Sequence, residues 1–207
     1  MHIVIGANGL AKQALPLFKK NPMVVFFDDT ENAPTWFHYH QVWNDLETLK
    51  EKIGNTSFIF TICIGEPKWR KHFSDLLTSL GGKTSNLISE KSSISQVSEL
   101  GNGNIFLDYS LIEAESNIGY CNLINCYVGI FHDVVIGDFN EIMPGAKLLG
   151  GSKIGNFCRI GSNSTILPNI KICDNVVIGA GAVVTKDITK PGTYIGIPAK
   201  KVDTKVI

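Results

Sequence analysis

The side chains best suited to chemistry in this sequence are a histidine and the aspartate that follows it, His132 and Asp133. A neutral imidazole near pH 7 can accept a proton from an amine or a hydroxyl. A neighbouring carboxylate can hold the ring tautomer and stabilise the imidazolium that forms. The pair therefore suggests general-base catalysis, although a surface histidine beside a solvated turn acid also fits. The remaining histidines all precede the region that contains this pair: His2, His38, His40 and His72.

His132 lies in a long segment in which apolar residues recur at every sixth position. The repeated positions are Ile94, Leu100, Phe106, Ile112, Ile118, Ile124, Ile130, Ile136, Ile142, Leu148, Ile154, Ile160, Ile166, Ile172, Ile178 and Val184. A run this regular is not expected by chance in a chain that is 44% hydrophobic. The segment is therefore a repeat, and neither helical spacing nor simple alternation describes it.

A six-residue unit is long enough for one short strand and a turn, so three units make a triangular coil. The large aliphatic residue is expected to point inward and stack on its counterparts in neighbouring coils. Small residues four positions further on are expected to point inward as well. Glycines often follow the aliphatic residue, where they are expected to relax the backbone at the corners: Gly101, Gly119, Gly137, Gly155, Gly161 and Gly179. His132, third in its unit, is expected to point outward.

The first 85 residues alternate strands and helices instead. Strands are predicted over residues 2–5, 23–27 and 58–64, the last buried on both faces. Helices are predicted over residues 10–20, 44–53 with Asn44 as N-cap, and 68–80. This alternation indicates a parallel sheet with right-handed crossovers. The sequence therefore predicts an α/β domain over residues 1–85 and about five coils of β-helix over residues 86–207.

The repeat resembles that of the hexapeptide-repeat acyltransferases, whose motif is aliphatic-Gly-x-x-small-x. The resemblance implies a left-handed parallel β-helix that assembles as a homotrimer with sites between neighbouring subunits. Segments 3–12, 26–29 and 62–65 with Arg70, together with the ending 192–200, look like the NeuD/PglD-type sugar acyltransferases. In those proteins a small Rossmann-like domain precedes the β-helix.

The same resemblance suggests how the residues around His132 act. His132 and Asp133 match the family's catalytic His-Glu/Asp stretch, with His132 as the base. Asn125 matches a polar active-site position, although a corner asparagine is an equal interpretation. Glu141 stands where many members carry a second histidine, and its role stays open. Gly150, one coil beyond His132, is where the family places a backbone N–H near the thioester, or it is simply a tight corner.

Two ligand sites follow from the resemblance. Coenzyme A is expected along the groove toward the C-terminal coils, with the contacts Gly150, Ala180, Gly196, Lys200 and Lys201, although the two lysines also fit a solubilising tail. A nucleotide-linked sugar is expected on the N-terminal domain, with the contacts Gly6, Asn8, Gly9, Asp28, Asp29, Gly65 and Arg70. The turn at residues 6–9 joins a strand to a helix, so its N–H groups can hold a phosphate. It lacks the full GxGxxG fingerprint, and a purely structural turn remains possible.

Composition limits the partners. Nineteen basic and nineteen acidic residues cancel, so there is no basic excess to attract nucleic acid or an anionic membrane. No apolar run approaches the length of a transmembrane helix. The start of the chain has no signal-peptide pattern. Five cysteines without CxxC spacing indicate reduced thiols, and we expect a cytoplasmic protein.

These observations favour an acetyl-CoA-dependent N-acetyltransferase. Its acceptor would be the amino group of a nucleotide-linked sugar, in particular a 4-amino-4,6-dideoxyhexose of surface-polysaccharide or glycan biosynthesis. O-acetylation of a sialic acid or another sugar hydroxyl is the alternative, because one base serves both reactions. A non-catalytic scaffold or binding module is a third reading. A zinc hydratase would need three histidine ligands, whereas the repeat has one, so we expect no metal.

Overall fold

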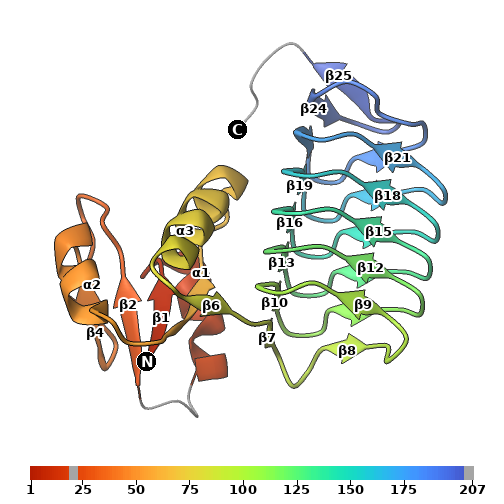
Figure 1. The fold of residues 1–207 in the computed structure, drawn as a ribbon. Helices are drawn as coiled ribbons and strands as arrows, with labels where there is room; N and C mark the ends of the chain where they lie inside the picture. The colour runs from red at the N-terminus through yellow and green to blue at the C-terminus, as the bar shows by residue number, and fades with distance from the viewer. Residues whose placement is uncertain (19–22, 203–207) are drawn as a thin grey trace. The chain divides into compact units, whose positions relative to one another are not determined.

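The computed structural model describes residues 1–18 and 23–202 and divides into two compact units, Met1–Leu87 and Ile88–Ile207. Figure 1 shows an α/β unit followed by stacked coils of short strands. The division falls two residues beyond the boundary expected at residue 85.

Within residues 1–18 and 23–87, six strands form one sheet in the order β3-β4-β2-β1-β5-β6. The strands are β1 His2–Ile5, β2 Val24–Phe27, β3 Trp36–Phe37, β4 His40–Trp43, β5 Ile59–Ile62 and β6 Lys83–Thr84. All adjacent pairs are parallel, as predicted, except β3 with β4. A two-residue loop joins β3 to β4, and so short a loop can connect only antiparallel neighbours.

The helices of this unit are α1 Gly9–Ala14, which continues as the 3₁₀ turn Leu15–Phe18, then α2 Leu46–Ile53 and α3 Pro67–Ser79. The prediction of Asn44 as N-cap was wrong. Asp45 caps α2, because its Oδ1 accepts a 2.7 Å hydrogen bond from the Thr48 N–H. The Asn44 amide instead donates to the carbonyls of Asp28 and Pro34. The last two residues of the helix expected over 10–20 lie outside the described residues.

The core of the α/β unit lies between the sheet and its helices. Ile3, Phe27 and Phe60 from the central strands pack with Leu49 of α2 and Leu77 of α3. The strand expected over residues 58–64 is shorter, and its first residue, Ile59, is 39% exposed. The other three residues of β5 are buried, which fits a strand at the centre of the sheet.

The second unit is a triangular prism built from parallel strands, most of them two residues long. Its first sheet, in order from the C-terminal end, is β25 Lys200–Val202, β24 Gly192–Ile195, β22 Val176–Ile178, β19 Arg159–Ile160, β16 Glu141–Ile142, β13 Leu123–Ile124, β10 Ile105–Phe106 and β7 Leu87–Ile88. The second is β23 Val183–Val184, β20 Thr165–Ile166, β17 Lys147–Leu148, β14 Gly129–Ile130, β11 Leu111–Ile112 and β8 Ser93–Ile94. The third is β21 Lys171–Ile172, β18 Lys153–Ile154, β15 Val135–Ile136, β12 Asn117–Ile118 and β9 Glu99–Leu100.

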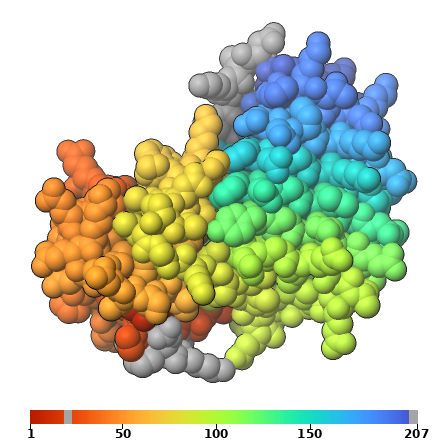
Figure 2. All heavy atoms as spheres, in the orientation of Figure 1, coloured from red at the N-terminus to blue at the C-terminus, as the bar shows by residue number. Residues whose placement is uncertain are grey.

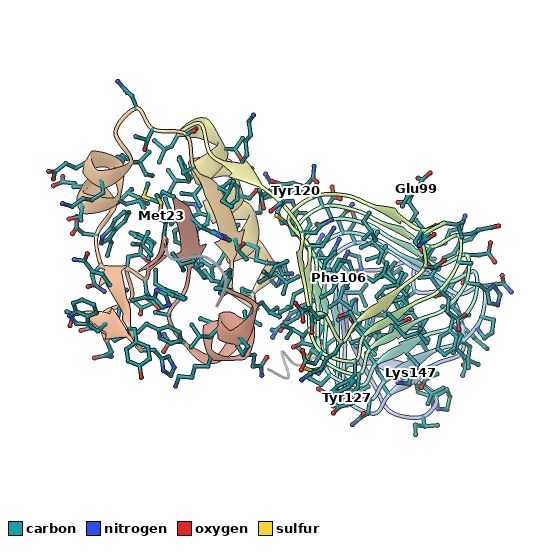
Figure 3. All side chains as sticks on the ribbon, turned by 90° about the horizontal axis from the view of Figure 1, so that it is seen from below. Met23, Glu99, Phe106, Tyr120, Tyr127 and Lys147 are labelled. Atoms are coloured by element: carbon teal, nitrogen blue, oxygen red, sulfur yellow. The ribbon has the colours of Figure 1, made fainter. Side chains whose placement is uncertain are left out.

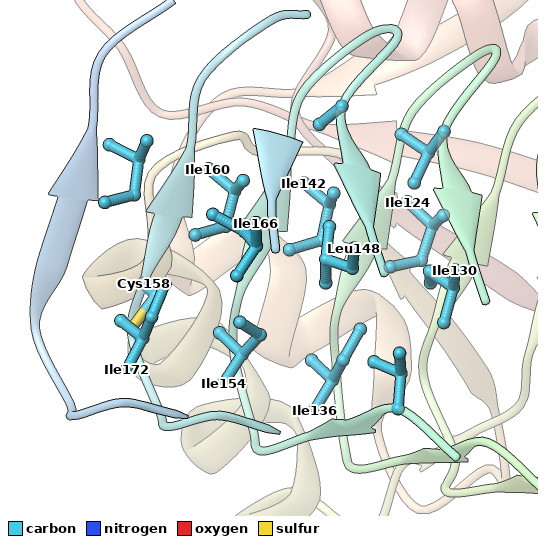
Figure 4. Close-up of a cluster of buried hydrophobic side chains, with 14 of the residues drawn as sticks. Ile124, Ile130, Ile136, Ile142, Leu148, Ile154, Cys158, Ile160, Ile166 and Ile172 are labelled. Carbon is cyan, nitrogen blue, oxygen red and sulfur yellow. The ribbon is translucent and has the colours of Figure 1, made fainter. Parts of the chain in front are cut away.

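Apart from the antiparallel pair β24 and β25 at the C-terminal end, strands pair in parallel with the strand one coil further along the chain, for example Ile112 with Ile130 and Ile130 with Leu148. The repeated aliphatic residues therefore stack in columns inside the prism, as predicted (Figure 4). Figure 3 views the prism from one end, with Phe106 inside and Tyr127 and Lys147 outside. In Figure 2 the coils appear as successive bands packed edge to edge. Because the described part of the chain leaves no space between coils, residues from neighbouring coils meet at each corner.

We number the corners of the prism by the strands they join. The first corner leads from the first sheet to the second, the second corner from the second sheet to the third, and the third corner back to the first sheet. Inside the third corner, buried asparagines form a ladder: the side-chain oxygens of Asn104, Asn122 and Asn140 each accept a 2.7 Å hydrogen bond from a backbone N–H in the next coil. These bonds satisfy the buried side-chain oxygens, whereas Nδ2 of Asn122 and of Asn140 donates to no group among the described residues.

The role predicted for the glycines was wrong. The left-handed conformation falls on the third residue after the inward aliphatic: Tyr109, Glu115, Cys121, Tyr127, Asp133, Phe139, Phe157, Asn163, Asn169 and Asn175, and also Gly103, Gly145, Gly151 and Gly181. A glycine directly after the aliphatic residue, such as Gly119, lies against the next coil instead. A Cβ there would be 2.7 Å from the Gly137 carbonyl oxygen. These glycines are needed for close packing between coils rather than for turning the chain.

Gly137→Ala is therefore expected to destabilise the prism, because the new Cβ would lie 2.8 Å from the Gly155 carbonyl oxygen. We expect a loss of about 1–3 kcal/mol in the free energy of unfolding, measured by denaturant titration. The matched control is Gly181→Asn, at a left-handed position with open space around it, where other coils carry asparagine. Equal losses in the two variants would contradict the packing role.

Candidate active site

His132 and Asp133 lie in the second corner, in the turn between β14 and β15. The Asp133 backbone is left-handed, with φ of 62°, a conformation that aspartate tolerates better than most residues. His132 Nδ1 lies 2.7 Å from Asp133 Oδ2. The side chains are 66% and 55% exposed, as expected for an outward position. Because Asp133 engages Nδ1, Nε2 is the ring nitrogen left to meet a substrate.

The coils before and after His132 complete its surroundings. On the N-terminal side, Glu113 Oε2 accepts a 3.2 Å hydrogen bond from the His132 backbone N–H. On the C-terminal side, the ring lies against Gly150, where a Cβ would be 2.5 Å from Cε1 and 2.6 Å from Nε2. Any side chain at position 150 would therefore displace the imidazole. The Gly151 N–H donates a 3.0 Å hydrogen bond to the His132 carbonyl, which fixes the distance between the two coils at this corner.

The electrostatics of this corner strengthen His132 as a base. The hydrogen bond to Asp133 raises the pKa of His132 above 6.5, and the negative charges of Asp133 and Glu113 act in the same direction. The slight burial of the ring opposes them. His132 therefore needs a higher pH than an isolated histidine before its neutral, proton-accepting form predominates.

Asn125 and Glu141 are not brought to His132 within one chain. Asn125 lies in the first corner, where its amide Nδ2 donates to the Ile142 carbonyl at 3.1 Å. Glu141 lies on β16 of the first sheet, and its Oε2 accepts a 2.9 Å hydrogen bond from Arg159 Nε in a mostly buried ion pair. Neither side chain has a contact with His132 among the described residues.

The residues expected to hold coenzyme A are also spread over the prism. Gly150 contacts His132 in the second corner, whereas Ala180 is exposed in the first corner. Gly196, Lys200 and Lys201 are exposed at the C-terminal end, in and beside the antiparallel pair β24 and β25. One chain therefore presents these positions on more than one face.

The α/β unit contains a cavity of about 590 Å³ at the carboxyl ends of its central strands, the place where open α/β sheets bind ligands. Its lining includes six of the predicted positions, namely Gly6, Asn8, Gly9, Asp28, Asp29 and Gly65. Gly6 cannot be replaced freely, because its φ is 93° and a Cβ would lie 2.8 Å from the Cys63 carbonyl oxygen. Glycine at position 6 thus allows the turn at residues 6–9 to pass close to the Cys63 backbone at the edge of the cavity.

Two of the predicted contacts are engaged inside the protein. Asp28 is buried, and its carboxylate accepts hydrogen bonds from the Ala7 N–H at 2.8 Å, from Asn8 Nδ2 at 3.1 Å and from Thr30 Oγ1 at 2.6 Å. Arg70 is 2% exposed, and it donates to the Ile64 and Gly65 carbonyls rather than lining the cavity. Asp28 thus belongs to the cavity wall with its carboxylate already hydrogen-bonded, Arg70 lies outside the lining, and Asp29 is the exposed acid of the lining.

Sequence reasoning missed the aromatic wall of this cavity. Trp69 and Phe73 of α3 line it, together with Leu10 and Thr30. Trp69 is 55% exposed, which is unusual for so large an apolar side chain. Its position in the first turn of the helix that follows β5 was the available signal, because that turn meets the carboxyl edge of the sheet.

Residues 1–18 and 23–202 contain no group of three or more histidine, cysteine, aspartate or glutamate side chains placed to hold a metal ion. Among the described helices, none is both long and apolar enough to cross a membrane.

Comparison with known families identifies the repeat. The model described as bacterial transferase hexapeptide (six repeats) matches residues 133–168 and 151–186. Residues 133–186 thus carry the hexapeptide repeat of the bacterial transferases. UDP-3-O-acylglucosamine N-acyltransferase from Bordetella avium (strain 197N) is 33% identical over 99 residues, which are 48% of this chain and 27% of that protein. The chain thus spans about a quarter of the length of the curated relative it matches.

Solved structures of hexapeptide-repeat acyltransferases match nearly the whole chain. The acetyltransferase domain of PglB from Neisseria gonorrhoeae FA1090 has a TM-score of 0.90 and 26% identity, covering 97% of this chain and 98% of that one. It is also known in complex with acetyl coenzyme A. PerB from Caulobacter crescentus, in complex with CoA and GDP-perosamine, has a TM-score of 0.87 and 25% identity, covering 97% and 96%. The fold is therefore the predicted α/β domain followed by a left-handed β-helix.

Asp133→Asn is expected to lower the pKa of His132, because it removes the negative charge that favours the imidazolium. The midpoint of the His132 ring signals in an NMR titration should move to lower pH. Glu115→Gln, one coil earlier at the position equivalent to Asp133, is the control and should leave the midpoint in place. A midpoint equal to that of the parent protein in Asp133→Asn would show that the 2.7 Å contact does not govern the titration.

Proposed function

We propose that this protein transfers the acetyl group of acetyl-CoA to the amino group of a nucleotide-linked 4-amino-4,6-dideoxyhexose, with His132 as general base. The observation that carries the proposal is the His132–Asp133 pair, whose Nδ1–Oδ2 distance is 2.7 Å and whose ring lies directly against Gly150. The similarity to an acetyltransferase domain known with acetyl coenzyme A, and to PerB known with CoA and GDP-perosamine, supports the choice of both substrates.

The chemistry needs few groups. His132 Nε2 accepts a proton from the sugar amine, whose lone pair attacks the thioester carbonyl carbon. The tetrahedral oxyanion then collapses, the carbon–sulfur bond breaks, and the CoA sulfur takes the proton from the imidazolium. Asp133 stabilises the imidazolium between these steps. Within the described chain, the Gly150 N–H donates no hydrogen bond to protein, so it is available to the oxyanion.

The nucleotide is assigned to the cavity of the α/β unit. Its lining residues include no lysine or arginine. The Gly6 and Ala7 N–H groups already donate to the Phe27 carbonyl and to Asp28, so the Asn8 and Gly9 N–H groups would hold the diphosphate. Asp29 can accept hydrogen bonds from a ribose or base, and the exposed face of Trp69 can stack on the base. Coenzyme A is assigned to the C-terminal coils, with Gly150, Ala180, Gly196, Lys200 and Lys201 as contacts.

A homotrimer would bring the separated groups of the site together. His132 lies in the second corner and Asn125 in the first, and a prism that packs beside another copy can present these two corners to one shared groove. Asn125 would then contact the sugar from a neighbouring copy. The proposed role is in surface-polysaccharide or glycan biosynthesis in the cytoplasm.

His132→Asn should remove most of the turnover while leaving ligand binding intact. Asparagine cannot act as a base at neutral pH, so we expect kcat to fall by about 10²–10⁴-fold. The assay would follow released CoA thiol with UDP-, dTDP- and GDP-linked 4-amino-4,6-dideoxyhexoses, and calorimetry would follow CoA binding. Unchanged kcat would reject His132 as the base. Acetylation of free sialic acid, with none of the amino sugars accepted, would favour the hydroxyl alternative.

Trp69→Ala should weaken nucleotide-sugar binding without altering the fold, since a stacking platform is lost from an exposed position. We expect the KM for the nucleotide sugar to rise by roughly 5- to 100-fold and the KM for acetyl-CoA to stay the same. Trp69→Phe should retain part of the affinity. Trp36→Ala is the control, because Trp36 is 63% exposed and lies outside the cavity lining. If Trp69→Ala and Trp36→Ala had the same KM for the nucleotide sugar, the nucleotide base would not stack on Trp69.

A further inference from the structure

A groove of about 380 Å³ opens beside His132 on the side of the N-terminal coils. Its walls come from β8, β11 and the turns that follow them: Ser93, Ile94, Ser95, Leu111, Ile112, Glu113, Ala114 and His132. Glu113 is the one acidic side chain among these lining residues, and none of them is lysine or arginine. The groove is therefore a small, largely neutral surface with a single carboxylate next to the proposed base.

The position of this carboxylate is set by the prism. Glu113 lies one coil before His132, and its Oε2 accepts the 3.2 Å hydrogen bond from the His132 backbone N–H. Among the described hydrogen bonds, Oε1 of Glu113 accepts none. One oxygen thus holds the catalytic turn, and the other remains available to the groove. Gly150, on the opposite side of the ring, contributes no charge.

Resting on the proposed function, we propose that Glu113 is a positioning and selectivity residue that makes the site prefer an acceptor arriving as an ammonium ion over one arriving as a hydroxyl. A carboxylate attracts a cation and forms a charge-assisted hydrogen bond with it, whereas it gives a neutral hydroxyl much less. The residue would therefore distinguish N-acetylation from O-acetylation, a distinction that one general base cannot make.

The preference for a cation agrees with the acid–base chemistry of the groove. An ammonium group loses two protons on its way to the amide. The first passes through His132 Nε2 to solvent before attack, which leaves a neutral amine and a neutral imidazole. The second passes to His132 Nε2 as the nitrogen attacks and then to the CoA sulfur. Glu113 stabilises the positive charge first on the acceptor and then on the imidazolium. Asp133, from the turn of His132 itself, is the other charged group facing the ring. Glu113 therefore affects acceptor binding and the titration of His132 together.

The test compares Glu113→Gln with Glu115→Gln. Glutamine keeps an oxygen for the His132 N–H and removes only the charge, and Glu115 is an exposed acid in the same corner that does not line the groove. In Glu113→Gln we expect a rise of roughly two- to fivefold in the KM for the 4-amino-4,6-dideoxyhexose nucleotide that the parent protein accepts best. The inhibition constant of its 4-hydroxyl analogue should stay unchanged. Glu115→Gln should behave as the parent protein.

The second readout is an NMR titration of His132 without substrate. We expect a lower midpoint in Glu113→Gln and no change in Glu115→Gln. The inference is overturned if Glu113→Gln weakens binding of the amine and of its hydroxyl analogue equally, or if it leaves the His132 midpoint unchanged. Because the titration needs no substrate, its result is separate from the proposed function, which fails if no nucleotide amino sugar is acetylated.

Discussion

The register of one coil on the next is the constraint on which the site depends. Parallel pairing sets Ile112 against Ile130 and Ile130 against Leu148, so each corner stacks directly on the corner of the preceding coil. His132 therefore meets Glu113 on one side and Gly150 on the other. No single coil contains the proposed base, the carboxylate that holds its turn and the glycine that leaves room for its ring. The arrangement exists only when three coils are stacked.

The same stacking determines where glycine is required. At Gly137 a side chain would strike the backbone of the next coil, so the residue there must lack a Cβ. The left-handed turn position tolerates larger residues, and this freedom allows the coil of His132 to place Asp133 there. The turn that leads the chain from the second sheet to the third thus also places Asp133 against His132. Asp133 thus both adopts the left-handed turn conformation and contacts the His132 ring.

The repeat could be predicted because every coil carries the same signal, a large aliphatic residue at each sixth position. The pair of His132 and Asp133 could be predicted because its residues are adjacent in sequence. Glu113 was missed, because the repeat places residues 113–115 beside His132 but does not show which of their side chains reaches it. Asp28 was predicted as a substrate contact after the second strand, but its hydrogen bonds with Ala7 and Asn8 were not foreseen, because they come from residues 20 or 21 positions away. The antiparallel pairing of β3 was missed because two residues are too few to show a pattern.

Although the net charge of the chain is zero, the cavities of its two units favour ligand groups of opposite charge. The cavity of the α/β unit has no lysine or arginine in its lining, and its buried acid, Asp28, is already held by Ala7, Asn8 and Thr30. An anion bound there, as proposed, would be held by backbone N–H groups. The groove beside His132 is lined by the carboxylate of Glu113 and by no lysine or arginine, which favours a cationic acceptor. A nucleotide-linked amino sugar has an anionic diphosphate at one end and an amine at the other, and it meets both demands, whereas a nucleotide sugar that bears only hydroxyl groups meets the first alone.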